Sequence, residues 1–471
     1  MNFCTTTLGC KVNQVETEAI ESMLISKGHA LAKPGDGCDV CIINTCAVTA
    51  ESVRKSRQAV RRMKKSEPDA LIAVCGCFSQ LESDAAKDLG ADIIGGSGDR
   101  HGFASDIEKA VSASQSVISR ENVDLASSRI INQDSEQNSL QSLNQVTVDS
   151  EQDFALSNQF EELPLGGTAG RTRAFLKVQD GCDNFCAYCI IPIARGRVRS
   201  LPLDRAVMQA ERLAGQGFKE IVITGIEISS YGKDLGASLS VIDVIREIGN
   251  AVPSSRIRLG SLDPSVFDES FCNELAKINN LCNHFHLSLQ SGCDDTLLRM
   301  GRKYTTATVA TSISNLRKLF PDCGITADLI VGFPGETDAE FKQTLDFIAT
   351  ARFSDMHIFP FSPRPKTRAF NMPDQVSQEV RRKRAKQAVA LAQKNALDFM
   401  HSQLNKVVEV LIEQKKGEYW IGNSGNYLEV AVRDEVTKNN ICCVRVTDVA
   451  DGKVLGVYQN KSFVALPTPD D

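Results

Sequence analysis

The segment Cys182-Asp183-Asn184-Phe185-Cys186-Ala187-Tyr188-Cys189 places three thiols at CxxxCxxC spacing within one short stretch. It follows an apolar run, residues 174–178, that has the pattern of a strand, and Gly181 permits a sharp exit from that strand. Three thiolates in one loop can hold three irons of a cubane cluster and leave the fourth iron open. An open iron can bind a small molecule, so the segment predicts more than an electron-transfer centre.

Two simpler interpretations of these thiols are a structural zinc site and buried core cysteines. A zinc site needs a fourth Cys or His in paired spacing, and residues 190–197 contain neither. Three thiols at this spacing favour ligation over packing.

Composition limits the class of protein. The chain has 471 residues, 42% of them apolar, which is enough for two to four domains with real cores. No apolar run approaches the roughly 20 residues of a membrane span. The N-terminal residues do not have the basic region followed by an apolar stretch that is typical of a secretory signal, so we expect none. We therefore expect a cytoplasmic protein whose 16 cysteines are metal ligands and core thiols rather than disulfides.

The net charge of −6 is unevenly distributed. Residues 113–162 hold nine Asp or Glu against Arg120 and Arg129, so the remaining chain is nearly neutral. Basic residues gather at 54–65, 195–205 and 364–386. Such clusters predict phosphate-binding faces, although solvated helix surfaces have the same pattern.

Residues 1–110 alternate strand and helix patterns, which predicts an α/β domain with a doubly wound parallel sheet. Strands are expected at 2–8, 41–43, 70–75 and 93–94, and helices at 16–27 and 51–65.

Ligands of such sheets lie beyond the carboxyl ends of the strands, where Cys10, Cys46 and Cys77 are expected. They are candidates for a second three-thiolate cluster. Spacing alone leaves chance as an equal competitor, because other cysteines are near: Cys4, Cys38, Cys41 and Cys75. Cys77 is preferred to Cys75 because it follows a glycine in the turn, whereas Cys75 belongs to the strand.

The rest of the chain divides into three parts. Residues 111–172 are acidic and polar, typical of a linker or insertion without stable order. Residues 173–400 repeat a strand–helix unit about six times, which predicts a partial (βα)6 barrel of the TIM type. Its strands are expected at 174–178, 220–224, 256–259, 285–289, 325–331 and 356–359. After a basic helix at 375–400, residues 401–467 contain five short strand patterns, which predict a small oligonucleotide-binding-like β-barrel.

Three strand ends of the expected barrel carry candidate ligand-binding groups. The second ends in Gly225, which permits close approach to the backbone, and Glu227, which can accept an ammonium group. The fourth ends in alternating polar side chains, Ser288 and Gln290. The fifth ends at Val331 and Gly332, where exposed backbone can bind a purine. Together they predict a site for an amino-acid–nucleoside ligand.

CxxxCxxC with an aromatic residue, Tyr188, before its last cysteine resembles the radical S-adenosylmethionine (SAM) superfamily. The whole chain resembles the methylthiotransferases, through residues 7–14, 44–49, 175–182 and 286–292. That resemblance implies a three-Cys domain at 1–110, a radical SAM domain at 173–400 and a TRAM domain at 401–467. It also makes the Cys10/Cys46/Cys77 cluster the expected partner of the first.

The resemblance implies two 4Fe–4S clusters and SAM as cofactors. Cys182, Cys186 and Cys189 would hold the cluster that cleaves SAM to a radical, which removes hydrogen from C2 of an adenine. The cluster at Cys10, Cys46 and Cys77 would deliver a methylthio group. The subgroup resembled modifies N6-threonylcarbamoyladenosine 3′ of the anticodon, at tRNA position 37. Implied partners are the tRNA anticodon stem-loop and an electron donor such as flavodoxin or ferredoxin, with a monomeric enzyme and no membrane.

Two alternatives stay open. A related enzyme could modify N6-isopentenyladenosine or a ribosomal-protein aspartate. The sequence of residues 11–14, however, resembles the subgroup that modifies N6-threonylcarbamoyladenosine. A non-catalytic iron–sulfur RNA-binding protein is the alternative of another class, which Glu227 and Gln290 disfavour.

Overall fold

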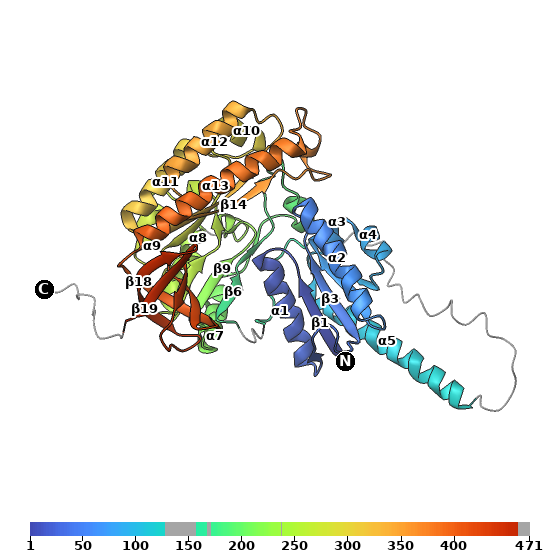
Figure 1. The fold of residues 1–471 in the computed structure, drawn as a ribbon. Helices are drawn as coiled ribbons and strands as arrows, with labels where there is room; N and C mark the ends of the chain where they lie inside the picture. Colours follow the sequence, from blue (N-terminus) through green and yellow to red (C-terminus); the bar gives the residue numbers. More distant parts are fainter. Residues whose placement is uncertain (128–156, 167–170, 237, 460–471) are drawn as a thin grey trace. The chain divides into compact units, whose positions relative to one another are not determined.

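The computed structural model describes residues 1–127, 157–166, 171–236 and 238–459 (Figure 1). These residues form two compact units that exchange short segments of chain. The first unit takes the described residues up to 166 together with Gly181–Asp183 and Cys189–Arg197, and the second takes the other described residues. The CxxxCxxC segment is therefore shared between the packing of both units.

The first unit is built on a five-stranded parallel sheet of order β2-β1-β3-β4-β5. Its strands are β1 (Asn2–Thr7), β2 (Ala30–Leu31), β3 (Val40–Thr45), β4 (Leu71–Gly76) and β5 (Ile93–Ile94). All six residues of β3 are buried, as expected for a central strand covered on both faces.

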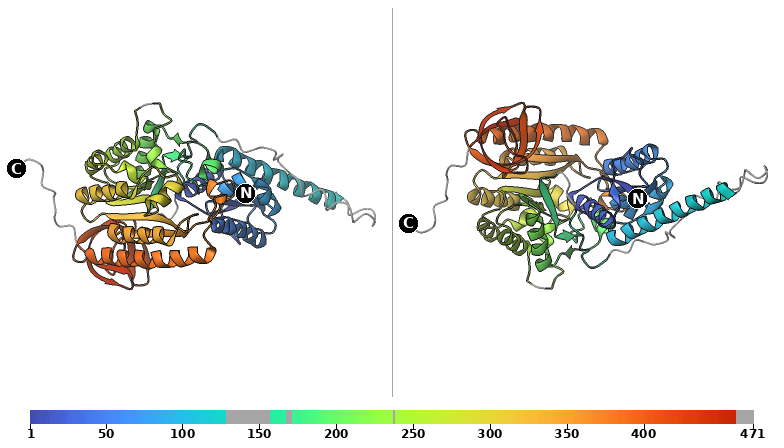
Figure 2. Two further views of the ribbon diagram at one scale, coloured as in Figure 1. Left: turned by 90° about the horizontal axis from the view of Figure 1, so that it is seen from above. Right: turned by 90° about the horizontal axis from the view of Figure 1, so that it is seen from below.

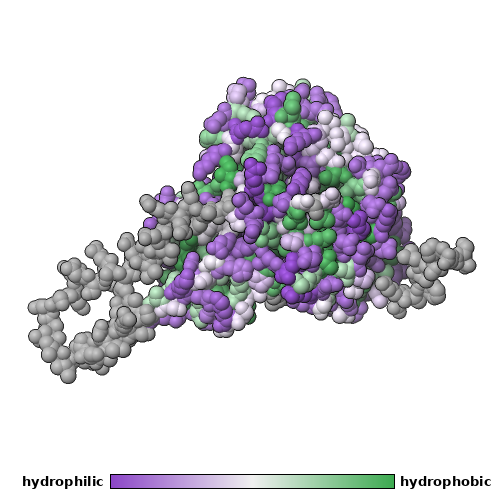
Figure 3. Space-filling view, turned by 180° about the vertical axis from the view of Figure 1, so that it is seen from behind, coloured by the Kyte–Doolittle hydropathy of each residue, from purple (hydrophilic) through white to green (hydrophobic). Residues whose placement is uncertain are grey.

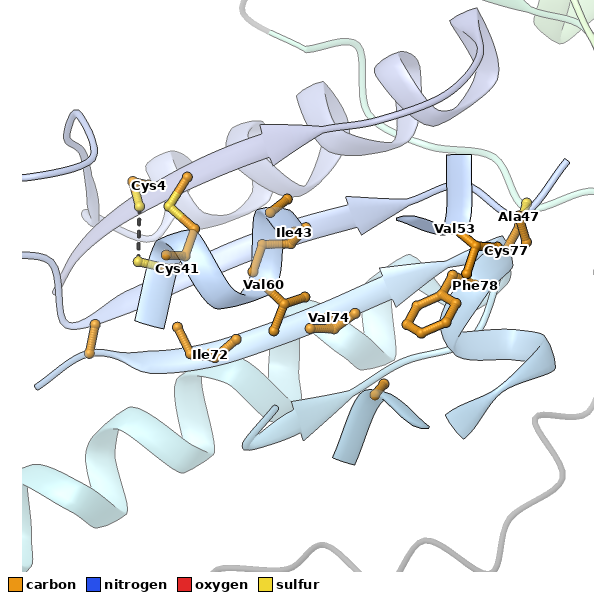
Figure 4. Packing of buried hydrophobic residues seen from close by; sticks show 14 of the residues in the cluster. Cys4, Cys41, Ile43, Ala47, Val53, Val60, Ile72, Val74, Cys77 and Phe78 are labelled. Atoms are coloured by element: carbon orange, nitrogen blue, oxygen red, sulfur yellow. Dashed lines mark hydrogen bonds between the residues drawn. The ribbon is translucent and has the colours of Figure 1, made fainter. Parts of the chain in front are cut away.

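Helices cover both faces of this sheet, which confirms the predicted doubly wound arrangement. On one face α1 (Lys11–Ser26) and α5 (Arg100–Ser127) pack on strand residues such as Phe3 and Ile42. On the other face α2 (Ala50–Ser66), α3 (Cys77–Leu81) and α4 (Ser83–Asp88) pack on the core around Ile43 and Val74 (Figure 4).

The predicted linker at 111–172 is partly wrong. Helix α5 continues through Ser127, and apolar residues at helical spacing in its first part, Ile107, Ala110 and Val111, pack on the sheet. Within 157–166, Glu161 accepts a hydrogen bond from the Arg100 backbone N–H at 2.5 Å. The remainder of the predicted linker at 128–156 and 167–170 lies outside the described residues.

The second unit contains seven parallel strands in two sheets, and β10 and β11 together take the place of the third of the six strands predicted for a partial barrel. Figure 2 shows these strands surrounded by helices. A three-stranded sheet, β10-β9-β6, and a four-stranded sheet, β11-β12-β13-β14, meet where only Gly260 separates β10 from β11. Their bounds are β6 (Arg173–Lys177), β9 (Glu220–Thr224), β10 (Arg256–Leu259), β11 (Ser261–Leu262), β12 (His284–Gln290), β13 (Gly324–Val331) and β14 (Asp355–Pro360). Within the described residues β6 and β14 do not pair, so the barrel is open.

Helices follow the strands and cover the outer side of the barrel. They are α7 (Leu203–Gly215), α8 (Val241–Ala251), α9 (Glu269–Ala276), α10 (Asp294–Met300), α11 (Thr306–Leu319) and α12 (Asp338–Ala351). A longer helix, α13 (Gln378–Ser402), lies along β14 (Figure 1). Its last turn adds Phe399 and Met400 to the core of the C-terminal barrel.

The C-terminal strands close into a five-stranded barrel of order β15-β16-β17-β19-β18, which confirms the predicted short-strand pattern. The strands are β15 (Val407–Lys416), β16 (Tyr419–Ser424), β17 (Glu429–Val432), β18 (Ile441–Ala450) and β19 (Lys453–Tyr458).

Two buried arginines join this small barrel to the larger one. Arg256 and Arg258 at the start of β10 both pair with Glu220, the first residue of β9. Their remaining N–H groups donate to backbone carbonyls of the small barrel, those of Glu409, Asn423, Ser424 and Gly425. The small barrel thus docks at the amino ends of β9 and β10, opposite the ends where ligands of βα barrels bind.

No helix of the described chain is long and apolar enough to cross a membrane. On the face seen in Figure 3, hydrophilic and hydrophobic residues are interspersed.

Replacing Glu220 by Gln should destabilise the second unit at pH 7 by about 3 kcal/mol, since it leaves two buried guanidiniums against a neutral group. Burial raises the pKa of Glu220, but the arginines more than reverse this and lower it from 4.5 to about 2. A lowered folded-state pKa stabilises above the unfolded value, and that stabilisation disappears as pH falls from about 4.5 toward 2. Calorimetric unfolding of the full chain should therefore show a difference that shrinks from pH 7 to pH 3.

The control is Glu269→Gln, which removes an exposed pair with Lys318 and should change stability little. An equal effect of both substitutions at pH 7 would contradict the role given to Glu220.

Candidate active site

The first unit brings Cys10, Cys46 and Cys77 to one edge of its sheet. Cys10 is the residue before α1, Cys46 follows β3, and Cys77 opens α3 directly after β4. Because β1, β3 and β4 are neighbours and parallel, all three thiols lie at the carboxyl ends of adjacent strands. Cys75 lies inside β4 and packs in the core beneath α1 and α5, as the preference for Cys77 requires.

The Cys10 and Cys46 loops are held against each other. The amide of Asn13 donates to the carbonyl of Leu8 at 2.8 Å and to that of Thr45 at 2.9 Å. Gly9 has φ +105°, and a Cβ there would lie 2.9 Å from Cβ and 3.1 Å from Sγ of Cys46. Any larger residue would displace the Cys46 thiol.

Another pair of thiols, Cys4 and Cys41, lies 3.1 Å apart between β1 and β3. Figure 4 shows this pair at one end of the strands, with Cys77 and Ala47 at the other end. Cys4 and Cys41 are therefore core thiols, separate from the three at the carboxyl edge.

Electrostatics at this edge depend on a buried cation. Burial raises the pKa of the Cys77 thiol to about 12, Arg195 opposes the rise, and the neighbouring Cys10 and Cys46 add to it. A metal ligand must be a thiolate, so loading a cluster requires loss of this proton. The Cys10 side chain is exposed, which leaves the edge accessible.

That cation belongs to a buried ionic network. Arg195 donates to Glu16 at 2.8 and 3.2 Å and to Asn13 at 2.7 Å. Arg100 donates to the same carboxylate at 3.1 Å and to the Gly96 carbonyl at 2.8 Å. Both guanidiniums are fully buried, and both donate to the Glu16 carboxylate. The Arg195 cation lowers the pKa of the nearby Cys10 and Cys77 thiols against the effect of burial, which suits a site for an anionic thiolate cluster.

The sequence left the basic cluster at 195–205 as either a phosphate-binding face or a solvated helix surface, and neither holds for Arg195 and Arg199, which are buried. The same correction applies to Arg364 and Arg384 within 364–386. Arg384 pairs with Glu336 and Asp338, both at 2.7 Å. Sequence shows charge but not burial, and these arginines were missed as structural residues.

The Cys182 and Cys189 ends of the CxxxCxxC segment pack with the first unit. Cys182 follows β7 (Gln179–Asp180), and its N–H donates to the Gly196 carbonyl at 3.0 Å. Gly181 has φ +70°, and a Cβ there would lie 1.8 Å from the Arg197 carbonyl oxygen, so the predicted sharp exit requires glycine. Cys189 lies just before α6 (Ile191–Arg195), the short helix that ends in Arg195.

Cys186 packs with the second unit and lines a cavity of about 140 Å³. Glu227 and Asp263 line the same cavity, and Arg302 reaches Cys186 Sγ at 3.2 Å and Asp263 at 2.9 Å. Asn184 donates to Glu227 at 3.3 Å. Burial, reinforced by Asp263, raises the pKa of Glu227, and a cation bound in the cavity would favour the charged carboxylate again.

Ser288 and Gln290 lie on β12, which the same arginine contacts. The Ser288 carbonyl accepts hydrogen bonds from the Tyr304 hydroxyl and, at 3.3 Å, from Arg302. Gln290 has φ +65°, and the pairing with β13 shifts register between Leu287 and Gln290. A bulge therefore interrupts the expected plain alternation and redirects Gln290.

The structure differs from expectation at the other three predicted contacts. Gly225 packs against Gln179, whose backbone carbonyl would lie 2.9 Å from an added Cβ. The close approach at Gly225 is therefore made by another part of the chain and not by a ligand. The Val331 side chain is fully buried and its carbonyl accepts from Phe361 N–H at 2.8 Å. Gly332 N–H donates to Glu336 at 2.6 Å. These backbone groups are already engaged rather than exposed for a purine.

Sequence reasoning missed Arg302, Asp263, Asn184 and Tyr304. Arg302 and Tyr304 follow α10 within the run Gly301-Arg302-Lys303-Tyr304, and Asp263 follows β11. No spacing rule connects these residues with Cys186. Of these four residues, only Asp263 had a recognisable sequence signal, which is an acidic residue directly after a strand.

Comparisons with known proteins agree with this geometry. Residues 176–348 match the radical SAM superfamily, and residues 2–96 match Uncharacterized protein family UPF0004. The structure of the radical S-adenosylmethionine methyltransferase TsrM from Kitasatospora setae has TM-score 0.54 at 16% identity, covering 78% of this chain and 75% of that one. The fold and site thus define a radical SAM enzyme, a class that uses SAM and a 4Fe–4S cluster, with an added N-terminal thiol domain.

Sequence relatives extend over nearly the whole chain. Threonylcarbamoyladenosine tRNA methylthiotransferase MtaB of Bacillus subtilis is 34% identical over 434 residues, 91% of this chain and 89% of the relative. MtaB of Thermotoga maritima is 34% identical over 463 residues, which cover 95% of this chain and 98% of the relative. The tRNA-2-methylthio-N(6)-dimethylallyladenosine synthase of Pelotomaculum thermopropionicum is 31% identical over 460 residues, which cover 95% of this chain and 96% of the relative. The chain belongs to the radical SAM methylthiotransferase family.

Replacing Arg195 by Met should lower the iron bound at the first-unit thiols, because it removes the cation that opposes the rise in the pKa of Cys10 and Cys77. We expect the purified variant to lose about half of its cluster iron and to show an altered electron paramagnetic resonance spectrum after reduction.

The matched control is Arg197→Met, an exposed arginine two residues further along the same loop. Iron content equal to wild type in the Arg195 variant would contradict a role in holding the cluster.

Proposed function

We propose that this methylthiotransferase adds a methylthio group to C2 of N6-threonylcarbamoyladenosine at position 37 of tRNA, 3′ of the anticodon. The observation that carries the proposal is the full-length match to MtaB relatives, in a chain that places one three-thiol set on the N-terminal sheet edge. A match of 31% to the dimethylallyladenosine synthase makes N6-isopentenyladenosine the second candidate substrate.

In this proposal Cys182, Cys186 and Cys189 hold one 4Fe–4S cluster, and Cys10, Cys46 and Cys77 hold the other. When bound, these clusters and SAM supply the radical, sulfur and methyl group that no side chain can provide. Glu227 accepts the ammonium of SAM, and Arg302 stabilises the Cys186 thiolate. Ser288 and Gln290 contact SAM from β12, and Gly225, Val331 and Gly332 shape the strand ends around it through their internal contacts.

The proposed partners are the anticodon stem-loop of tRNA and a one-electron donor such as flavodoxin or ferredoxin. We further propose that the enzyme is cytoplasmic, because its substrate tRNA is in the cytoplasm. We also propose that it is a monomer.

Nucleoside analysis of tRNA tests the function. In cells whose only copy carries Cys186→Ala, the 2-methylthio form of N6-threonylcarbamoyladenosine should disappear, since Cys186 lines the cavity beside Glu227. Mass spectrometry of tRNA nucleosides measures this loss.

Loss confined to 2-methylthio-isopentenyladenosine, or to a methylthio-aspartate of a ribosomal protein, would assign another substrate. Unchanged modification of all three would overturn the proposed function. Cys443→Ala, a partly exposed cysteine of β18, is the matched control.

The C-terminal barrel offers a surface suited to RNA. Exposed Lys416 lies opposite Tyr419 across the β15–β16 hairpin, and Arg433 stacks over the Tyr419 ring at 5.0 Å. Lys415 lies over the Trp420 ring at 5.3 Å. Cations combined with aromatic rings are the groups that contact phosphates and bases of single-stranded RNA.

The double substitution Lys416→Ala/Arg433→Ala should weaken tRNA binding about tenfold near physiological salt and reduce the slope of log affinity against log salt by up to about two. Fluorescence anisotropy with labelled tRNA at several salt concentrations gives both quantities. Lys342→Ala/Lys394→Ala, two exposed lysines on α12 and α13, is the control pair. Unchanged affinity and slope in the first variant would remove this surface from the RNA-binding site.

A further inference from the structure

The CxxxCxxC segment carries an exposed aromatic ring that the proposed cluster and SAM contacts do not use. In the described chain three phenylalanines are exposed, Phe185, Phe359 and Phe370, and all lie at or beyond the carboxyl ends of barrel strands. Phe185 is the most exposed of them, at 54%, and directly precedes Cys186. Large exposed rings at the ligand-binding end of a βα barrel indicate a contact with another molecule.

Phe185 also has an unfavourable backbone conformation. Its φ of +47° is in the left-handed region, which bulky residues rarely adopt. Lys366, in the loop after β14, is exposed and has φ +70°. Neither side chain is buried in compensation, and glycine would adopt both conformations at lower cost. Strained backbone of this kind is concentrated at functional sites.

Arg368 lies beside Phe185 on a firm support. It begins the short 3-10 helix η3 (Arg368–Phe370), and the Ala369 N–H joins this helix to the cluster segment by donating to the Ala187 carbonyl at 2.8 Å. The Arg368 guanidinium donates to the Phe185 carbonyl at 3.4 Å. It is exposed and pairs with no carboxylate of the described chain, so its charge is available to an anion.

The end of α10 makes room for this guanidinium. Gly301 has φ +77°, and a Cβ there would lie 2.8 Å from Nη2 of Arg368. The next residue, Arg302, contacts Cys186 Sγ at 3.2 Å. The exposed Arg368 cation therefore lies close to the thiol that is proposed to hold the SAM-cleaving cluster.

We propose that Phe185 and Arg368 form a contact site for an unpaired nucleotide of the substrate RNA next to the target adenine, in which Phe185 stacks on the base and Arg368 binds its phosphate. This inference rests on the proposed function, because the anticodon loop is single-stranded. Proteins commonly hold unpaired RNA bases on aromatic rings and their phosphates with basic side chains. Lys366 supplies a second cation on the same loop, and Phe370 supplies a second ring.

An acidic electron-carrier protein is the competing occupant, since the proposed cluster needs a one-electron donor. Two observations favour RNA. Arg368 is accompanied by two exposed rings, Phe185 and Phe370, which suit bases better than an acidic surface. The same loop also exposes Asp374, whose neighbour Gln375 donates to the Ala369 carbonyl at 2.8 Å. A protein that binds through its acidic side chains would meet a like charge there.

Binding of anticodon stem-loops to the anaerobic holoenzyme, followed by fluorescence anisotropy, tests the base contact. One RNA carries N6-threonylcarbamoyladenosine in an intact loop, and two others lack the base on its 5′ or its 3′ side. Phe185→Ala should weaken binding of the intact RNA about tenfold. It should barely affect one of the abasic RNAs, because the stacked base is already missing there. Phe185→Tyr should bind like wild type, whereas Phe185→Leu, which keeps the apolar volume, should lose most of the affinity gained from the ring.

Salt dependence tests the phosphate contact. Arg368→Ala should weaken binding of the intact RNA severalfold and reduce the slope of log affinity against log salt by about 0.7, the value for one phosphate of a single strand. Arg368→Lys keeps the charge and should keep most of the slope. The control is Arg212→Ala, an exposed arginine of α7 on the outer side of the barrel, which should change neither quantity.

Iron content and melting temperature equal to wild type show that a variant is folded and loaded. Equal weakening of all three RNAs by Phe185→Ala overturns the stacking contact, and an unchanged slope in Arg368→Ala overturns the phosphate contact. Normal RNA affinity in both variants, with slower reduction of the cluster by flavodoxin, assigns the surface to the electron carrier instead. A wild-type preference for an N6-isopentenyladenosine stem-loop refutes the proposed substrate. The contact site then stands if Phe185→Ala weakens binding of that RNA and falls if it does not.

Discussion

The buried contact between Arg195 and Glu16 is the constraint on which the functional part of this protein depends. A guanidinium without water must have its charge balanced and its N–H groups bonded, and removing one partner of such a pair commonly costs about 3–5 kcal/mol. Glu16 and Asn13 of α1 meet this requirement for Arg195. Because Arg195 follows Cys189 by six residues, the pair holds the end of the CxxxCxxC segment in the first unit.

The same pair shapes the chemistry at the sheet edge. Glu16 also pairs with Arg100, and the Arg195 charge lowers the pKa of Cys10 and Cys77 against the effect of burial. Glycine at position 9 then lets the Cys46 loop close over the Cys10 loop. Arg195 opposes the rise in the pKa of the Cys77 thiol that burial causes, but it does not reverse that rise.

In the second unit, the residues that hold the C-terminal barrel lie at the amino ends of the strands, and the residues around the cavity lie at the carboxyl ends. At the amino ends of β9 and β10, Glu220 and its two arginines hold the C-terminal barrel. At the carboxyl ends, Arg302 instead gathers Cys186, Asp263 and the Ser288 carbonyl around a small cavity.

The sequence alone determined the order of the elements, since hydrophobic periodicity and turn glycines are local properties of the chain. It also located the strand-end thiols Cys10, Cys46 and Cys77, because the carboxyl ends of parallel strands share one edge. It could not tell buried from exposed charge, so Arg195 and Arg384 were expected on a phosphate-binding face or a solvated helix surface, whereas both are buried. Only the tertiary structure brought Arg302 to Cys186 and Arg368 to Phe185, because such contacts between distant segments leave no periodic trace. The sequence thus determined which groups can react, and packing decided which charges and side chains surround them.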